Sequence, residues 1–138
     1  MERERTKTAP FSPALDLATG VPVYRQIIDQ VLGAIASGTL SGGDQLPTVR
    51  QLAVDLSINP NTVVRAYREL EIRGILTTQQ GIGTFVTTQP VPVDEAVRQR
   101  QLDQLIGDLL ARAGAAGLSA DEVVARLQEF INEQRGIS

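Results

Sequence analysis

The chain has 138 residues, of which 42% are hydrophobic, and it contains no cysteine and no histidine; its formal net charge is −3. This length allows one compact domain with a small appendage, but it is too short for two large cores. Without cysteine or histidine the chain lacks a disulfide framework, the usual zinc and haem ligands and the usual general base. We therefore expect no metal, no cofactor and no enzymatic activity.

No segment approaches the roughly twenty consecutive apolar residues that a membrane helix needs. Residues 1–10 also lack the apolar core of a signal peptide. We therefore expect a cytoplasmic protein without a membrane partner.

The negative charge is unevenly distributed along the chain. Residues 21–88 contain five arginines and five carboxylates, whereas residues 89–138 contain five arginines and eight carboxylates. Because neither segment has a basic field, nucleic-acid binding would rely on a few well-placed arginines, backbone donors and helix N-termini.

Residues 1–20 mix charge, proline and threonine without periodicity, which predicts a flexible lead-in. The alternative is that Phe11 and residues 15–17 dock on the body of the protein. From Pro22 onward, apolar residues at helical spacing predict a first helix that ends at Ser37 and Gly38. The apolar positions of this helix are Val23, Ile27, Ile28, Val31 and Ile35.

A short second helix is predicted after Pro47. Thr48 and Gln51 have the spacing of a capping box, in which each side chain bonds an otherwise unpaired backbone N–H. After this helix, Asn59 suits an N-cap and Pro60 suits the first position of the next helix. The apolar face of the second helix comprises Val49, Leu52, Ala53 and Leu56.

In the third predicted helix one side is apolar and the opposite side is polar. At about 100° per residue, Asn61, Arg65 and Arg68 lie opposite the apolar side, and Thr62 and Val64 lie on its flanks. Such a polar face alone is typical of any solvated helix. Here a capped helix and a tight turn precede it and a hairpin follows, which favours a recognition helix of a winged helix-turn-helix. The core face comprises Val63, Ala66, Tyr67 and Leu70.

The predicted wing follows directly. Gly74 fits a left-handed helix end, and strands are predicted at residues 75–79 and 84–87, joined through Gln80, Gly81 and Gly83. Glycine at the tip permits close approach of the backbone to DNA, although glycine in a hairpin is usually only a turn device.

Over residues 22–87 the chain resembles the DNA-binding domain of the GntR family of bacterial transcription regulators. The resemblance implies that Arg50 contacts a guanine or an adjacent phosphate, that Thr62 binds a phosphate, and that Gly81 brings the wing to the minor groove. The matching positions are Leu46, Pro47, Arg50, Leu52, Ala53, Thr62, Val63, Leu70, Glu71, Gly74, Gly81, Gly83, Thr84 and Val86.

Pro60 and Val64 stand where this family usually has arginines. We therefore expect Asn61 and Arg65 to take over part of the base readout, because an amide suits adenine and a guanidinium suits guanine. Arg68 is either a phosphate contact or a solvated surface charge. The complete set of predicted DNA-binding residues is Thr48, Arg50, Asn59, Asn61, Thr62, Arg65, Arg68, Gln80, Gly81 and Gly83.

Residues 59–71 are similar to both the YtrA-like and the MocR-like branches of the family. MocR-like proteins continue into a large aminotransferase-like domain that binds pyridoxal phosphate. Here only about fifty residues follow the wing, which favours the YtrA-like branch.

Residues 89–138 predict two further helices. The first runs from about Pro92 to a break at residues 113–117, and the second opens with a capping box at Ser119 and Glu122. Two helices cannot bury two apolar stripes by themselves, so we expect them to pack with a second copy; the alternative is that they cover the first domain. The predicted interface residues are Leu102, Leu105, Ile106, Leu109, Leu110, Val123, Leu127, Phe130 and Ile131.

The sequence therefore predicts a mainly helical α+β chain with three parts: a lead-in (1–20), a winged helix-turn-helix domain (21–88) and a two-helix dimerisation element (89–138). The predicted function is a transcriptional regulator, specifically a repressor, whose homodimer binds an inverted-repeat operator in double-stranded DNA. The alternative is a winged-helix module that binds protein. We expect no enclosed small-molecule pocket, so an effector would act at the dimer interface.

Overall fold

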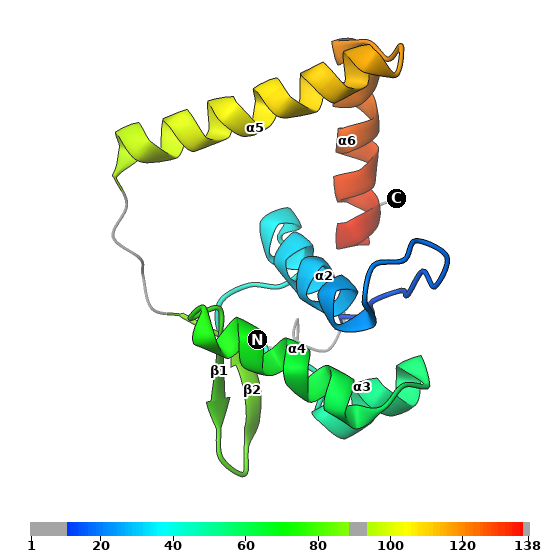
Figure 1. The fold of residues 1–138 in the computed structure, drawn as a ribbon. Helices are drawn as coiled ribbons and strands as arrows, with labels where there is room; N and C mark the ends of the chain where they lie inside the picture. Colours follow the sequence, from blue (N-terminus) through cyan, green and yellow to red (C-terminus); the bar gives the residue numbers. More distant parts are fainter. Residues whose placement is uncertain (1–10, 89–93, 137–138) are drawn as a thin grey trace. The chain divides into compact units, whose positions relative to one another are not determined.

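The computed structural model describes residues 11–88 and 94–136, which belong to two separate compact units (Figure 1). Within residues 11–88, the first unit contains three helices and a hairpin: α2 (Val23–Ser37), α3 (Val49–Leu56), α4 (Pro60–Ile72), β1 (Leu76–Gln79) and β2 (Gly83–Val86). The second unit contains α5 (Glu95–Ala115) and α6 (Ala120–Arg135). The predicted fold class, a winged helix-turn-helix followed by two helices, is confirmed.

The core of the first unit is built around α4, which packs against α2, α3 and β1. The predicted core face of α4 is confirmed, since its four apolar residues are all at most 3% exposed. The largest fully buried side chains come from three different helices and are Ile27, Ile28, Val31, Leu52, Val63 and Leu70.

The lead-in is held against α2 from Phe11 onward. Phe11 is 8% exposed and belongs to the core, whereas Leu17 stays 80% exposed. The Gln30 side chain accepts from the Ala14 N–H at 2.8 Å and donates to the Ala14 carbonyl at 2.6 Å. Gln26 makes the same pair of bonds with the backbone of Asp16, at 2.8 and 2.9 Å. The expected flexible lead-in therefore does not describe residues 11–20, while residues 1–10 lie outside the described part.

The junction between α4 and the wing has the geometry predicted for Gly74. Gly74 has a φ of +79°, its N–H donates to the Glu71 carbonyl at 3.0 Å, and the Ile75 N–H donates to the Leu70 carbonyl at 2.9 Å. These two bonds are a Schellman motif, which satisfies the last carbonyls of the helix and reverses the chain. The hairpin is antiparallel, with Leu76 opposite Val86, and its strands lie within one residue of the predicted ones.

In the second unit, α5 begins at Glu95, after the Asp94 carboxylate accepts hydrogen bonds from two backbone N–H groups. The predicted start near Pro92 lies outside the described residues. The capping box of Ser119 and Glu122 is present, with both reciprocal bonds formed. The helix α5 ends at Ala115, which lies within the predicted break at residues 113–117 but after its first residue.

Tyr67 offers a test of the core. It is 3% exposed, its hydroxyl donates to the Pro47 carbonyl at 2.8 Å, and burial raises the pKa of the phenol above its ordinary value of 10.0. Because the folded state disfavours the phenolate, Tyr67 contributes to stability below about pH 10, the pKa of the unfolded phenol. This contribution should be lost as the pH rises further.

We expect Tyr67→Phe to lower the free energy of unfolding near pH 7 by about 1 kcal/mol, since one hydrogen bond is lost. The variant should also lose less stability than the wild type between pH 7 and about pH 11. Denaturant unfolding at both pH values measures this. Equal alkaline losses in the two proteins would show that Tyr67 does not control the alkaline transition.

Candidate nucleic-acid interface

Thr48 and Arg50 lie at the N-terminus of α3. The Thr48 hydroxyl accepts a hydrogen bond from the Gln51 N–H at 3.0 Å and so caps the helix. The predicted capping box is only half formed, because the Gln51 side chain instead donates to Asp55, one turn along, at 2.9 Å. Arg50 is exposed and makes no hydrogen bond or ion pair with any residue that the structure describes. Its guanidinium is therefore available to a ligand.

The turn between α3 and α4 fixes the direction of α4. Ser57 adopts a left-handed conformation with φ 57°, and Ile58 bonds back to the Ala53 carbonyl at 3.0 Å. Asn59 then caps α4, because its Oδ1 accepts from the Asn61 N–H at 2.8 Å, and Pro60 occupies the first position of the helix. The predicted cap is confirmed. Its oxygen is engaged in the cap, which leaves the side-chain nitrogen of Asn59 for any contact with DNA.

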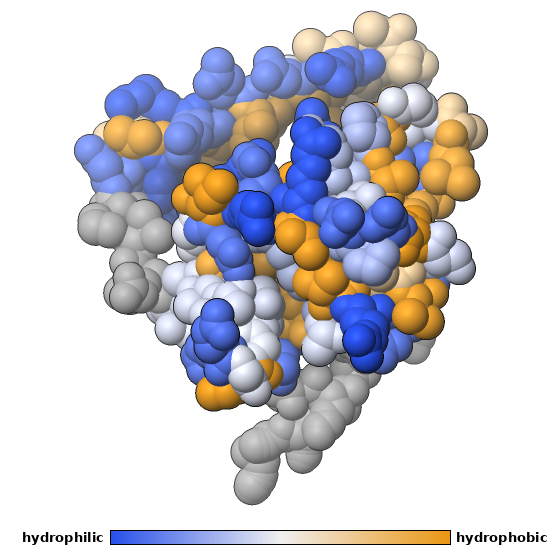
Figure 2. All heavy atoms as spheres, turned by 60° about the horizontal axis from the view of Figure 1, so that its bottom comes forward, coloured by the Kyte–Doolittle hydropathy of each residue, from blue (hydrophilic) through white to orange (hydrophobic). Residues whose placement is uncertain are grey.

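The outward face of α4 brings three of the predicted residues together. Asn61, Arg65 and Arg68 are exposed and share a shallow depression of about 400 Å³ along the helix. Thr62 lies half-buried on the flank. On the side of the first unit that carries the wing, turned toward the viewer in Figure 2, hydrophilic side chains are interspersed with apolar ones. The depression is lined by Asn61, Val64, Arg65, Arg68, Glu69 and Ile72.

The two arginines on this face are not neutralised by carboxylates. Glu69, which lines the same depression, is bound to Arg73 with Nε and Oε2 3.3 Å apart. Arg65 and Arg68 make no ion pair within residues 11–88 and 94–136. The outward face of α4 is thus locally cationic although residues 21–88 have no net charge.

Arg65 has a partner that the sequence did not predict. Its Cζ lies 3.7 Å from the centroid of the Tyr24 ring. Tyr24 is the second residue of α2, and its side chain is half-buried. No local spacing could have revealed this contact, because the two residues lie on different helices.

The wing tip depends on two glycines. Gly81 has a φ of +77° and Gly83 a φ of +148°, and the Ile82 N–H between them donates to the Gln79 carbonyl at 2.9 Å. Both values lie in the region that favours glycine. The tip exposes Gln80 and Ile82, the latter by 64%. Three predicted wing residues, Gln80, Gly81 and Gly83, therefore lie together at the end of the hairpin.

A segment before α3 supports the wing, and this support was not predicted from the sequence. Residues 44–46 are extended and pair with β2, and the Gln45 side chain donates to the Ile82 carbonyl at 3.2 Å. Pro47 was the available signal, because a residue before proline favours an extended conformation. The wing tip is thus held in place by its own strands and by a segment that is distant in the sequence.

Glu71 connects α4 to the wing. Its carboxylate accepts a hydrogen bond from the Thr78 hydroxyl on β1. Together with the Schellman motif at Gly74, this bond sets the orientation of the hairpin relative to the recognition helix.

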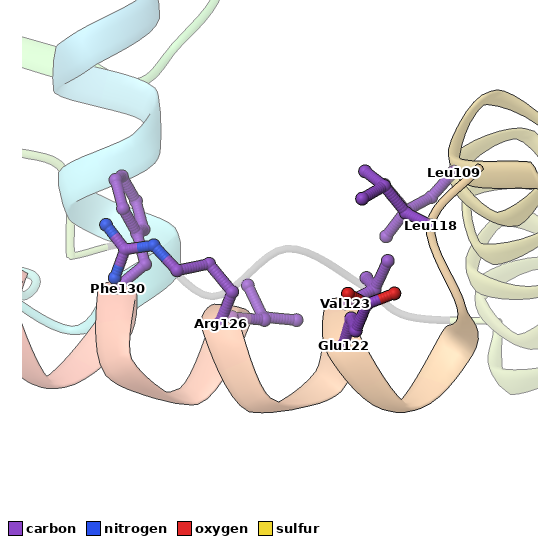
Figure 3. Close-up of a pocket in the computed structure, with 7 residues that line it drawn as sticks. Leu109, Leu118, Glu122, Val123, Arg126 and Phe130 are labelled. Carbon is purple, nitrogen blue, oxygen red and sulfur yellow. The ribbon is translucent and has the colours of Figure 1, made fainter. Parts of the chain in front are cut away.

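The second unit exposes most of its apolar residues. Ala113 is the only buried residue of α5, and α6 has none. An open hollow of about 560 Å³ lies between the two helices, and Figure 3 shows Leu109, Leu118 and Val123 around one end and Phe130 further along α6. Of the nine predicted interface residues, Val123 and Ile131 are half-buried and the other seven are exposed.

In the part of the chain that the structure describes, no group of three or more acidic, histidine or cysteine residues could hold a metal ion. Within the same residues, no helix has the length and apolar character to cross a membrane.

Comparison with known proteins identifies the family. Residues 23–86 match the family of bacterial regulatory proteins described as the gntR family. The chain is 36% identical over 126 residues to the HTH-type transcriptional repressor YtrA of Bacillus subtilis, covering 88% of this chain and 94% of YtrA. The chain belongs to the GntR family.

Further relatives of this GntR-family chain agree. The uncharacterized HTH-type transcriptional regulator YhcF of Bacillus subtilis is 33% identical over 79% of this chain and 89% of its own length. The structure of YtrA from Sulfolobus acidocaldarius, a GntR-family transcription factor, has 34% identity and a TM-score of 0.53, covering 71% of this chain and 96% of that one. The predicted resemblance to YtrA is confirmed, and the protein is a helix-turn-helix transcriptional regulator, not an enzyme.

The GntR-type wing offers a second test. A Cβ at Gly83 would overlap the side-chain amide of Gln45, whereas a Cβ at Gly81 would meet nothing within 4 Å. We expect Gly83→Ala to lower the free energy of unfolding by about 1–3 kcal/mol and by more than the matched control Gly81→Ala. Denaturant unfolding measures both variants.

A double variant tests whether the overlap with Gln45 contributes to the larger stability loss of Gly83→Ala. Introducing Gly83→Ala into a Gln45→Ala background should therefore destabilise the protein less than in the wild type. If the loss is the same in both backgrounds, Gln45 does not restrict the wing.

Proposed function

We propose that this regulator is a repressor that binds an inverted-repeat operator as a homodimer. The observation that carries the proposal is the outward face of α4, where Asn61, Arg65 and Arg68 lie together and the arginines have no ion pair among the described residues. Oppositely charged side chains three or four residues apart on a solvated helix can pair with each other, but Arg65 and Arg68 do not do so within the described residues. Cations left unpaired beside a wing suit the phosphates and guanine edges of DNA.

In this proposal the N-terminal half of α4 enters the major groove. Asn61 recognises adenine and Arg65 recognises guanine, while Thr62 binds a phosphate. Arg50, at the start of α3, contacts a guanine or an adjacent phosphate. The backbone at Gly81 approaches the minor groove, because no side chain stands in the way there.

The second unit supplies the dimer interface. In a single chain α5 and α6 bury almost none of their apolar side chains, and such isolated helix pairs are marginally stable in water. Leu105 is 67% exposed, Leu102 51% and Leu127 48%. A second copy of the same element would cover these side chains from both partners at once, since a twofold interface uses the same patch on each. The two recognition helices then read two inverted half-sites.

The repressor role is supported by the relation to Bacillus subtilis YtrA, which is named a transcriptional repressor and matches 88% of this chain. A repressor of this kind needs only to occupy its operator. A small-molecule effector would act at this dimer interface, where the apolar hollow between α5 and α6 lies.

Selection of bound sequences from random duplex DNA tests the proposal. We expect enrichment of an inverted repeat whose half-sites are centred about 10 base pairs, or a multiple of this, apart. Binding to the selected duplex should weaken steeply with salt, because the arginines displace counterions from phosphates. Absence of any enriched sequence would refute DNA recognition and favour a winged-helix module that binds protein.

Arg50 is the residue whose role is easiest to distinguish. We expect Arg50→Ala to weaken binding by about 1–3 kcal/mol and to relax the preference at one base pair in each half-site. Titration of the selected duplex and of single-base variants measures both effects. Uniform weakening on every duplex would instead identify Arg50 as a phosphate contact.

The dimer proposal predicts a clear effect of a charge at Leu127. We expect Leu127→Asp to shift the protein from dimer to monomer in sedimentation equilibrium, because the carboxylate would be buried in an apolar interface. Ala125→Asp places the same charge on the opposite side of α6 and should stay dimeric.

Near-ultraviolet circular dichroism of tyrosine is a control for folding, because Tyr24 and Tyr67 both lie in the first unit and the chain has no tryptophan. Its signal should be unchanged in Leu127→Asp. A dimeric Leu127→Asp variant would show that this face of α6 is not the interface.

A further inference from the structure

The contact between Arg65 and Tyr24 joins the recognition helix to the first helix of the unit. The guanidinium carbon lies 3.7 Å from the ring centroid, which is within the range of a cation–π contact. Arg65 is an exposed residue of α4 and lines the depression with Asn61 and Arg68. Tyr24 reaches it from the first turn of α2. The Tyr24 ring, from a helix outside the helix-turn-helix, thus contacts the Arg65 cation on the outward face of α4.

This contact uses the part of the guanidinium that does not donate hydrogen bonds. The five N–H donors of arginine lie in the plane of the group, whereas a ring stacks on its face. A stacked arginine can therefore still present its donors to the two acceptors of a guanine edge. A lysine at this position would keep the charge but not the planar donors.

The surroundings of Arg65 give its charge no other partner. Glu69, one turn further along α4, is engaged by Arg73 at 3.3 Å. Arg65 itself makes no hydrogen bond or ion pair in the described ranges 11–88 and 94–136. The tyrosine ring is therefore the interaction that orders this side chain, without neutralising it.

We propose that Tyr24 is a positioning residue for DNA recognition, which holds Arg65 in the conformation that reads a guanine in the major groove. This proposal rests on the proposed function. A long side chain that is ordered before binding loses less conformational freedom when it binds, so part of the affinity and of the base preference of Arg65 depends on Tyr24.

A double-mutant cycle on the selected duplex tests the proposal. We expect Tyr24→Leu to weaken binding about threefold to tenfold and to reduce discrimination at the base pair that Arg65→Ala also affects. Tyr24→Phe, the matched control, keeps the ring and should bind within about twofold of the wild type. In an Arg65→Ala background, Tyr24→Leu should cause no further loss.

Three results would overturn the proposal. One is wild-type affinity in Tyr24→Leu, and another is independent, additive losses from the two substitutions. The third is tighter binding by Tyr24→Leu, which would mean that the ring withholds Arg65 from DNA. If the wild type selects no duplex at all, the proposed function fails instead, so the two failures are distinguishable.

A second variant keeps the test decisive if Tyr24→Leu unfolds. Arg65 is exposed, so Arg65→Ala should fold, and thermal unfolding checks this. If Arg65→Ala binds the selected duplex with wild-type affinity and base preference, the proposal is wrong whatever the stability of Tyr24→Leu. Loss of preference at one base pair in each half-site supports the base contact of Arg65 on which the proposal depends.

Discussion

The fold depends on the burial of one face of α4. Val63, Ala66 and Leu70 are each 0% exposed, and the helix packs against α2, α3 and β1. Because the buried face is fixed by these contacts, the opposite face is fixed as well, together with the positions of Asn61, Arg65 and Arg68. The same packing places the wing, since Gly74 and Glu71 connect the end of α4 to the hairpin. Each element of the candidate site is thus positioned relative to one helix.

The electrostatics of the site are local. The first unit has no net charge over residues 21–88, so a general attraction to DNA is absent. Two arginines outside the candidate interface have carboxylate partners: Arg73 is bound to Glu69, and Arg126 in α6 lies 3.3 Å from Glu133 and 3.4 Å from Glu129. These two glutamates raise the pKa of Arg126. The arginines of the candidate interface have no such carboxylates among the described residues, so specificity rests on a few contacts of defined geometry.

Local signals in the sequence predicted most of this fold, and long-range contacts explain what was missed. Helical periodicity identified the core face of α4, and Asn59, Pro60 and Gly74 marked its ends, because caps act within a few residues of themselves. The support of the wing by Gln45 and the contact of Tyr24 with Arg65 join distant segments. Pro47 signals the extended backbone near Gln45, but no local pattern encodes either contact. The order of residues 11–20 was missed for the same reason, since it depends on glutamines of α2. The capping box at Thr48 was half wrong because Gln51 has a competing partner within its own helix.

We assign DNA binding to α4 and its neighbours, and binding of a second copy to α5 and α6. The most direct measurement is the change in backbone amide chemical shifts when the full chain is titrated with the selected duplex. This assignment of surfaces predicts that the largest changes cluster at the N-terminus of α3, along Asn61, Arg65 and Arg68, and at Gly81 in the wing. Changes concentrated in α5 and α6, with the outward face of α4 unaffected, would contradict it.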